Sequence, residues 1–169
     1  MLRPSIEWFC NRFSYDPETG VLIWRDGKHA GQVVATRKRS GYLIIRPKIN
    51  GKQRYFLVHR IAFVLMTGKW PLNDVDHWDG IRDNNCWKNL RAATRSQNKQ
   101  NLKGPLSTGS SGFLGVSPRK DSSTCPWRAD IETDGHQIYL GKFTTKEEAY
   151  RAYLTAKAKL HPFGGLADA

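Results

Sequence analysis

The sequence predicts a mixed α+β protein in which two patterns of strands and helix follow one another. Three observations lead to this prediction: a hairpin signal at Asn50-Gly51, a strand–loop–strand–helix pattern over residues 74–102, and a second strand and helix pattern that begins at residue 112. We therefore expect a β-rich N-terminal region leading into a two-strand and one-helix core. A small three-stranded antiparallel sheet packed on one helix should follow.

The first elements are delimited by turn residues. Pro17 presets one φ angle and Gly20 supplies a positive one, so the turn at 15–20 precedes the first strand. Asn50-Gly51 tolerates the positive φ angles of a tight hairpin and joins the next two strands. Gly68 ends the helix that follows. The expected elements are strands at 21–24, 41–46 and 53–58 and a helix at 59–67.

The second pattern follows residues 103–111, whose Gly, Pro, Ser and Thr content predicts a flexible linker. Asp134-Gly135 predicts a hairpin turn, and Thr145 with Glu148 forms a capping box that starts a helix. The expected strands are 113–117, 127–132 and 137–140, and the apolar stripe of the helix is Ala149, Ala152, Tyr153, Ala156 and Leu160. The expected domains are 1–102 and 112–163, with a tail at 164–169.

The charge pattern predicts a polyanionic partner. The chain has 169 residues and a formal net charge of +12, and ten basic residues with no acidic one lie between Asp26 and Asp74. Ribosomal and membrane-surface proteins are also basic, and some of these side chains could instead cover the edge of the core. We expect phosphate contacts from Arg37, Lys38, Arg39, Arg46, Lys48 and Arg54.

The cysteines and the hydropathy exclude other classes of protein. Cys10, Cys86 and Cys125 are far apart and form no Cys-x-x-Cys pair, which argues against a zinc knuckle and a disulfide framework. The longest apolar run, residues 61–66, is far shorter than a membrane span. We expect a soluble cytoplasmic protein without a membrane partner.

Polar residues between 74 and 102 predict phosphodiester chemistry. Cutting such a bond needs a base to activate water and a hard cation on the phosphate. A histidine suits the base because its ordinary pKa of about 6.5 is near working pH, and a carboxylate with an amide oxygen suits an Mg²⁺-like ion. Asp76 and His77 are adjacent, so a bend near Asp79-Gly80 is needed to bring both to one site.

The pattern Asp76-His77, Asn89-Leu90-Arg91 and Asn98-x-x-Asn101 resembles the HNH, or ββα-metal, nucleases in the form common among phage homing endonucleases. The resemblance covers most of residues 10–102. It implies that His77 is the general base, that Asp76 and Asn98 hold one divalent metal, and that Asn89 braces the loop and orients His77. Mg²⁺ is the expected ion, with Mn²⁺ as the alternative.

Nearby polar residues receive structural interpretations. Asn84 and Asn85 are expected to be turn residues rather than ligands. Asp79 and Asp83 are expected to be solvated loop carboxylates, with a contribution to metal affinity as the alternative. His59 is expected to cap or pack at the start of its helix, with contact to the site as the alternative.

Residues 112–163 resemble the ethylene-response-factor (Apetala-two) DNA-binding domain. The resemblance rests on segments 115–117, 127–131, 139–143 and 147–153. It implies that a three-stranded sheet enters the major groove of DNA and that Arg119, Lys120 and Arg128 contact DNA, with Trp127 partly packing. The alternative is a small domain for protein contacts.

Together these patterns predict a site-specific, metal-dependent DNA endonuclease of the homing type, acting on double-stranded DNA as a monomer. A DNA-binding regulator that retains a nuclease fold without cutting is the alternative from another class. An RNA-binding module is a weaker alternative because the sequence has no signature of the common RNA-binding folds.

Overall fold

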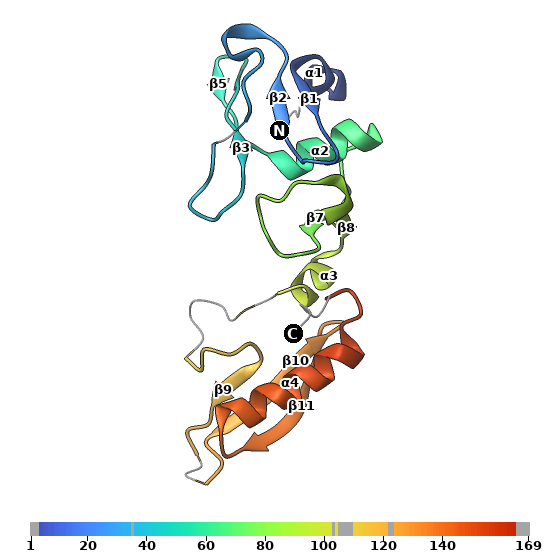
Figure 1. Cartoon of the computed structure of the whole chain (residues 1–169). Helices are drawn as coiled ribbons and strands as arrows, with labels where there is room; N and C mark the ends of the chain where they lie inside the picture. Colours follow the sequence, from blue (N-terminus) through green and yellow to red (C-terminus); the bar gives the residue numbers. More distant parts are fainter. Residues whose placement is uncertain (1–3, 35, 103, 105–109, 122–123, 165–169) are drawn as a thin grey trace. The chain divides into compact units, whose positions relative to one another are not determined.

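The computed structural model describes residues 4–34, 36–102, 104, 110–121 and 124–164 (Figure 1). The chain divides into two compact units, Met1–Ala93 and Thr94–Ala169, which are described separately. This division comes before the domain boundary expected at residue 102, so the helix that follows Ala93 is grouped with the second unit. Residues 103 and 105–109 of the expected linker lie outside the described residues.

The first unit begins with a helix that the sequence analysis did not predict. Helix α1 spans Ile6–Arg12, and the Ser5 side chain caps it by accepting a hydrogen bond from the Trp8 backbone N–H. Its C-terminal end leads directly into β1 (Phe13–Tyr15), which pairs antiparallel with β2 (Leu22–Trp24). A single turn of 3₁₀ helix, η1 (Gly27–His29), follows.

The predicted Asn-Gly hairpin is present, although its strands are shorter than expected. β4 (Lys48–Ile49) pairs with β5 (Lys52–Gln53) around Asn50 and Gly51, whose φ angles are 50° and 73°. Both values lie in the left-handed region that this turn requires. Further from the turn, β3 (Ile44–Ile45) pairs with β6 (Phe56–Leu57).

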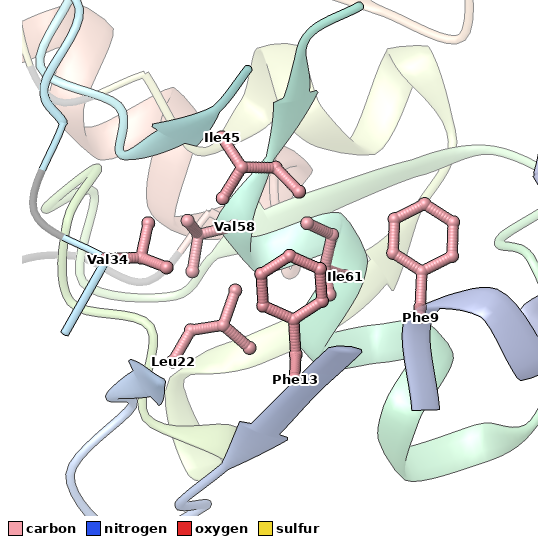
Figure 2. Close-up of a cluster of buried hydrophobic side chains, with 7 residues drawn as sticks. All are labelled: Phe9, Phe13, Leu22, Val34, Ile45, Val58 and Ile61. Carbon is pink, nitrogen blue, oxygen red and sulfur yellow. The ribbon is translucent and has the colours of Figure 1, made fainter. Parts of the chain in front are cut away.

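Helix α2 (Val58–Thr67) is the centre of the first unit. It ends at Gly68, which adopts a left-handed φ of 65°. Ile61 and Val58 of α2 are buried in a cluster of seven apolar side chains, and the other five come from α1, β1, β2, β3 and the segment between β2 and β3 (Figure 2). On another side, Ala62 packs against Val75 and Leu90. Thus α2 anchors the two strands that carry the polar residues of interest.

Those two strands form an antiparallel pair. β7 (Asp74–His77) and β8 (Leu90–Ala93) are joined by a long loop that includes η2 (Trp87–Asn89). The register places Asp76 opposite Arg91 and His77 opposite Leu90. Asp76 and His77 are therefore both delivered at the loop end of one short, well-anchored strand.

The second unit contains a three-stranded antiparallel sheet covered by a helix. α3 (Arg95–Gln100) starts at a capping box formed by Thr94 and Gln97. The sheet order is β11 (His136–Phe143), β10 (Trp127–Thr133) and β9 (Val116–Pro118). The first of these strands in sequence, β9, begins at Val116 rather than at residue 113.

Helix α4 (Lys146–Leu160) begins at the capping box of Thr145 and Glu148 that the sequence predicts. Ala149 of this helix packs with Val116 and Ala129 of the sheet, which forms the core of the unit. Lys157 is also buried, and its Nζ is satisfied there by donating to the carbonyl oxygen of Leu102 at 2.6 Å. The apolar stripe did not include this lysine.

Candidate active site

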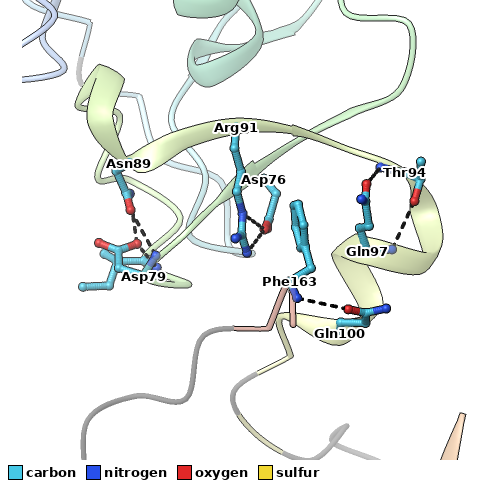
Figure 3. A network of polar contacts seen from close by, with 9 residues as sticks. Asp76, Asp79, Asn89, Arg91, Thr94, Gln97, Gln100 and Phe163 are labelled. Atoms are coloured by element: carbon cyan, nitrogen blue, oxygen red, sulfur yellow. Dashed lines mark hydrogen bonds and ion pairs between the residues drawn. The ribbon is translucent and has the colours of Figure 1, made fainter. Parts of the chain in front are cut away.

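The loop between β7 and β8 is closed by the side chain of Asn89. The Asn89 Oδ1 accepts a hydrogen bond from the Asp79 backbone N–H at 3.0 Å, and Nδ2 donates to Asp79 Oδ1 at 3.0 Å (Figure 3). Nδ2 also donates to the carbonyl oxygen of Asn84 at 2.7 Å. Asn89 is itself buried, so these bonds lock the loop onto the start of β8.

Asp79 is part of this lock rather than a solvated carboxylate. It accepts hydrogen bonds from the Ile81 backbone N–H and from the Asn84 and Asn89 side chains. Partial burial raises the pKa of Asp79, but these hydrogen bonds outweigh burial and hold it below its ordinary value. The expectation of a solvated loop carboxylate is therefore corrected for Asp79.

The ring of His77 bonds the side chain of Asn85, which was expected to be a turn residue. The ring Nε2 lies 3.1 Å from Asn85 Oδ1, whereas the Asn89 side chain is fully engaged by the loop. Asn85 is held in turn, since its Nδ2 donates to the carbonyl oxygen of Asp83 at 3.2 Å. With Oδ1 as the acceptor, a neutral His77 ring carries its proton on Nε2 and its lone pair on Nδ1.

The burial of His77 keeps this ring neutral. His77 is 3% exposed, and burial lowers its pKa below the ordinary value of 6.5. The hydrogen bond with Asn85 and the nearby carboxylates offset part of this effect. A ring that is neutral at pH 7 has the lone pair that a general base needs.

His59 lies against His77. Its contact with the site, which the sequence offered as the alternative to a purely capping or packing role, is therefore present. The ring centroids are 4.8 Å apart in an edge-to-face arrangement, and Tyr42 packs on both rings at 5.2 and 5.9 Å. Burial, then the neighbouring His77 and Arg60, lower the pKa of His59 to about 3. Among the described residues no hydrogen-bond partner meets its Nδ1.

Asp76 forms an ion pair with Arg91. Arg91 Nε and Nη2 lie 3.1 and 3.0 Å from Asp76 Oδ2, and Asp76 is 8% exposed (Figure 3). Arg91 belongs to the Asn89-Leu90-Arg91 motif, from which no role for this arginine was predicted. Its signal is the strand register, which is known only once β7 and β8 are paired.

The donor set around Asp76 suits a hard cation with few protein ligands. Within the ranges that the structure describes, no group of three or more His, Cys, Asp or Glu side chains is placed to hold a metal ion. A buried carboxylate fixed on a strand fits an ion of the Mg²⁺ type, which keeps most of its waters. It does not fit a zinc site, which takes at least three protein ligands. Asn98 lies on α3, in the second unit, and its pairing with Asp76 stays a prediction.

An N-terminal turn, residues 15–20, supports the loop that carries Asn85. Tyr15 Oη donates to the carbonyl oxygen of Asn85 at 2.6 Å, and the Trp87 backbone N–H donates to the carbonyl oxygen of Pro17 at 2.8 Å. Gly20 has a φ of +72°, and a Cβ added there would lie 2.4 Å from the Asn85 carbonyl carbon. Only glycine lets the turn and the loop approach this closely.

The predicted basic residues of the first unit lie around the β4–β5 hairpin and the segment before it. Arg37, Arg39, Arg46 and Lys48 are exposed, while Lys38 and Arg54 are half-buried. Arg37 forms an ion pair with Asp83 of the active-site loop, and the Lys38 ammonium lies over the Tyr55 ring at 4.8 Å. Four of the six expected phosphate contacts are therefore accessible to a polyanion, and their contact with DNA stays a prediction.

In the second unit, two of the predicted DNA contacts already have partners. Arg119 Nη2 lies 2.8 Å from Asp121 Oδ2, and Arg128 Nε lies 2.7 Å from Asp130 Oδ2. Lys120 is exposed beside them. Tyr139, 56% exposed and 5.5 Å from the Arg128 guanidinium, completes this surface and was missed by the sequence analysis.

Comparison with known families gives a match over the segment that contains β7 and β8. Residues 56–100 match a family model described as HNH endonuclease. This match supports the prediction of an endonuclease and places the similarity to the HNH family in residues 56–100. The matched segment contains α2, β7, the loop, β8 and α3, and so includes every residue of the site described above except Tyr15, Pro17, Gly20 and Tyr42.

One solved structure is also similar, described as DNA binding and cleavage by the HNH homing endonuclease I-HmuI. Its sequence is 28% identical, the similarity covers 60% of this chain and 57% of that chain, and the TM-score is 0.46. The similarity thus spans little more than half of either chain. No match was found among curated proteins. In the part of the chain that the structure describes, no helix is long and apolar enough to cross a membrane.

Proposed function

We propose that the chain is a site-specific DNA endonuclease of the homing type that hydrolyses phosphodiester bonds with His77 as general base and one divalent cation. The observation that carries this proposal is the neutral, buried His77 ring, whose Nε2 is bonded to Asn85 next to the Asp76 carboxylate on β7. The HNH family match over residues 56–100 supports the reaction class.

The proposed base acts through Nδ1. Asn85 fixes the Nε2–H tautomer, so Nδ1 is the ring atom that can accept a proton from water. His59 and Tyr42 pack on the ring and limit its rotation. When His77 takes the proton, Asn85 Oδ1 still accepts from Nε2–H, and the nearby Asp79 and Asp76 favour the imidazolium. The ring can then return the proton without moving.

Asp76 and Asn98 would hold the cation, Mg²⁺ with Mn²⁺ as the alternative. The Asp76 assignment is supported by its buried carboxylate at the loop end of β7, and Asn98 is assigned by the resemblance alone. A bound cation would neutralise negative charge on the phosphate and the leaving oxygen. Asn89 contributes by keeping the loop closed, so that Asn85 stays in place.

DNA is proposed as the substrate because of the charge and the second unit. The basic residues Arg37 to Arg54 suit phosphate contacts that carry no base specificity. The three-stranded sheet of the second unit, proposed as an ethylene-response-factor-type DNA-binding module, presents Arg119, Lys120, Arg128 and Tyr139 on one surface. Aromatic and arginine side chains together suit contacts with base edges and sugars.

The test is incubation of the full chain with plasmid and linear duplex DNA, with Mg²⁺, with Mn²⁺ or with chelator, followed by mapping of the cut ends. Cleavage that needs the cation and recurs at defined positions is expected. Binding of DNA without cleavage in either cation would instead indicate the non-cutting regulator, and cleavage at random positions would remove site specificity from the proposal.

A further inference from the structure

The antiparallel register builds a positive charge into the proposed cation site. Asp76 and Arg91 are directly opposite on β7 and β8, and two Arg91 nitrogens donate to the same carboxylate oxygen, Oδ2. The side chains are 9% and 22% exposed, so water and salt screen this pair poorly. The arginine is part of the strand ladder rather than a surface residue that happens to lie nearby.

This arrangement is unfavourable for a cation in the protein alone. Sites for hard divalent cations gain affinity as negative ligands are added. Arg91 instead offsets the charge of the Asp76 carboxylate. Because this pair is poorly solvated, the positive guanidinium also repels a metal cation that approaches the same carboxylate. A phosphate group of DNA supplies the negative charge that the ion pair lacks.

We propose that Arg91 makes cation binding at Asp76 conditional on DNA. The ion would bind weakly to the free protein and tightly to the protein–DNA complex. Coupling between two ligands is reciprocal, so the cation should raise DNA affinity by the same factor. This inference rests on the proposed function, because it takes Asp76 as a cation ligand and DNA as the substrate. Arg91 is here a positioning and charge-balancing residue.

The test measures Mn²⁺ binding to the full chain by the electron paramagnetic resonance signal of the free aqueous ion. All proteins carry His77→Ala so that DNA stays intact, and a titration of DNA alone is subtracted. In this background we expect Mn²⁺ to bind about tenfold or more tightly when duplex DNA is present, which lies in the range typical of such coupling. Asp76→Asn should abolish the binding attributed to this site in both conditions.

Arg91→Gln should strengthen Mn²⁺ binding to the DNA-free protein by about tenfold and shrink the effect of DNA. Arg91→Lys keeps the charge and should behave like the parent, which separates charge from packing. Arg91→Met provides a second neutral variant of similar length, and circular dichroism verifies the fold of each.

The proposal is overturned if a folded neutral variant binds Mn²⁺ no more tightly than the parent without DNA. Equal affinity of the parent with and without DNA overturns it as well, which decides the question even where both neutral variants unfold. If the parent binds DNA but takes up no Mn²⁺ at Asp76 in either condition, it is the metal assignment of the proposed function that fails.

Discussion

The β7–β8 loop and the sheet surface of the second unit both present polar side chains, but these are held by different kinds of bond. In the loop, Asn85 and Asn89 are buried and their amides bond backbone groups, the His77 ring and the Asp79 carboxylate. On the sheet, Arg119 and Arg128 pair with carboxylates two residues away, and in each pair one partner is exposed, Asp121 in the first and Arg128 in the second. Buried hydrogen bonds are costly to leave unmade, whereas an ion pair that water reaches through one partner is weaker and easier to exchange.

This difference suits two tasks. The proposed base must keep its orientation through the reaction, and the loop bonds the His77 ring through Asn85. The proposed DNA-binding surface must release its own partners when phosphates or bases arrive, and the arginine–aspartate pairs permit this exchange.

The largest effect is expected from His77→Ala. Removing a general base should slow cleavage by about 10²–10⁴-fold while DNA affinity is retained. Single-turnover cleavage and a gel-shift titration measure the two quantities. His29→Ala is the matched control because that histidine is exposed. A His77→Ala protein that cleaves at the parent rate would refute the assignment.

Asn85→Ala should come next. Without its acceptor, the His77 ring loses the bond that defines its tautomer and orientation, and a misplaced group can slow a reaction by about 10²-fold. Asn84→Ala is the control, because Asn84 bonds the same loop but does not contact His77. Similar loss of cleavage in both variants, at equal stability, would mean that loop closure alone matters.

His59 should make the first unit sensitive to acid. In the unfolded chain His59 takes up a proton below a pKa of about 6.5, but in the folded chain burial, the neighbouring His77 and Arg60 lower its pKa to about 3. The unfolded state therefore binds more protons between these values, and stability falls as the pH decreases through this window. The slope is about 1.4 kcal/mol per pH unit.

Urea denaturation between pH 7 and pH 4.5 measures this effect. His59→Gln has no titrating ring, so its stability should fall by about 2 kcal/mol less than that of the parent over the two pH units below 6.5. His136→Gln, which changes an exposed histidine, is the control. Parallel pH profiles for the parent and His59→Gln would contradict this assignment.

Charge removal on the two proposed DNA-binding surfaces should have smaller and distinct effects. Replacing Arg37, Lys38 and Arg39 with Gln should flatten the salt dependence of binding to any DNA, by about 0.9 in the log–log slope per lost phosphate contact. Because Arg37 is paired with Asp83, we expect fewer than three such steps.

Arg128→Ala should instead change which sequence is preferred, at about 1–3 kcal/mol if the arginine contacts a base. Its pairing with Asp130 favours the lower end of this range, since that pair must open first. Fluorescence anisotropy on target and random duplexes measures both effects. Equal loss on the two duplexes for Arg128→Ala would assign it to phosphate contact only.

The features that could be predicted from the sequence are those that depend on interactions between neighbouring residues. The Asn50-Gly51 turn and the capping box at Thr145 are local, so their positions could be predicted from a few neighbouring residues. Asn85 was interpreted as a turn residue because only the folded loop places its amide at His77. The same holds for Arg91, whose partner is defined by the strand register.

Helix α1 shows a different difficulty. Its seven residues carry only Phe9 as a fully buried side chain, so the apolar periodicity is too short to indicate a helix. The signal that remained was Ser5, a favoured capping residue, followed by Glu7 in the first turn.

The close approach of Gly20 to the β7–β8 loop limits how short a segment of this protein could be transferred to another protein. The segment that matches the HNH family begins at residue 56, but the loop that orients His77 rests on Tyr15, Pro17 and Gly20. A graft of residues 56–100 alone would carry the chemistry without its support. The contacts behind the loop therefore define the transferable unit, which must begin before Tyr15.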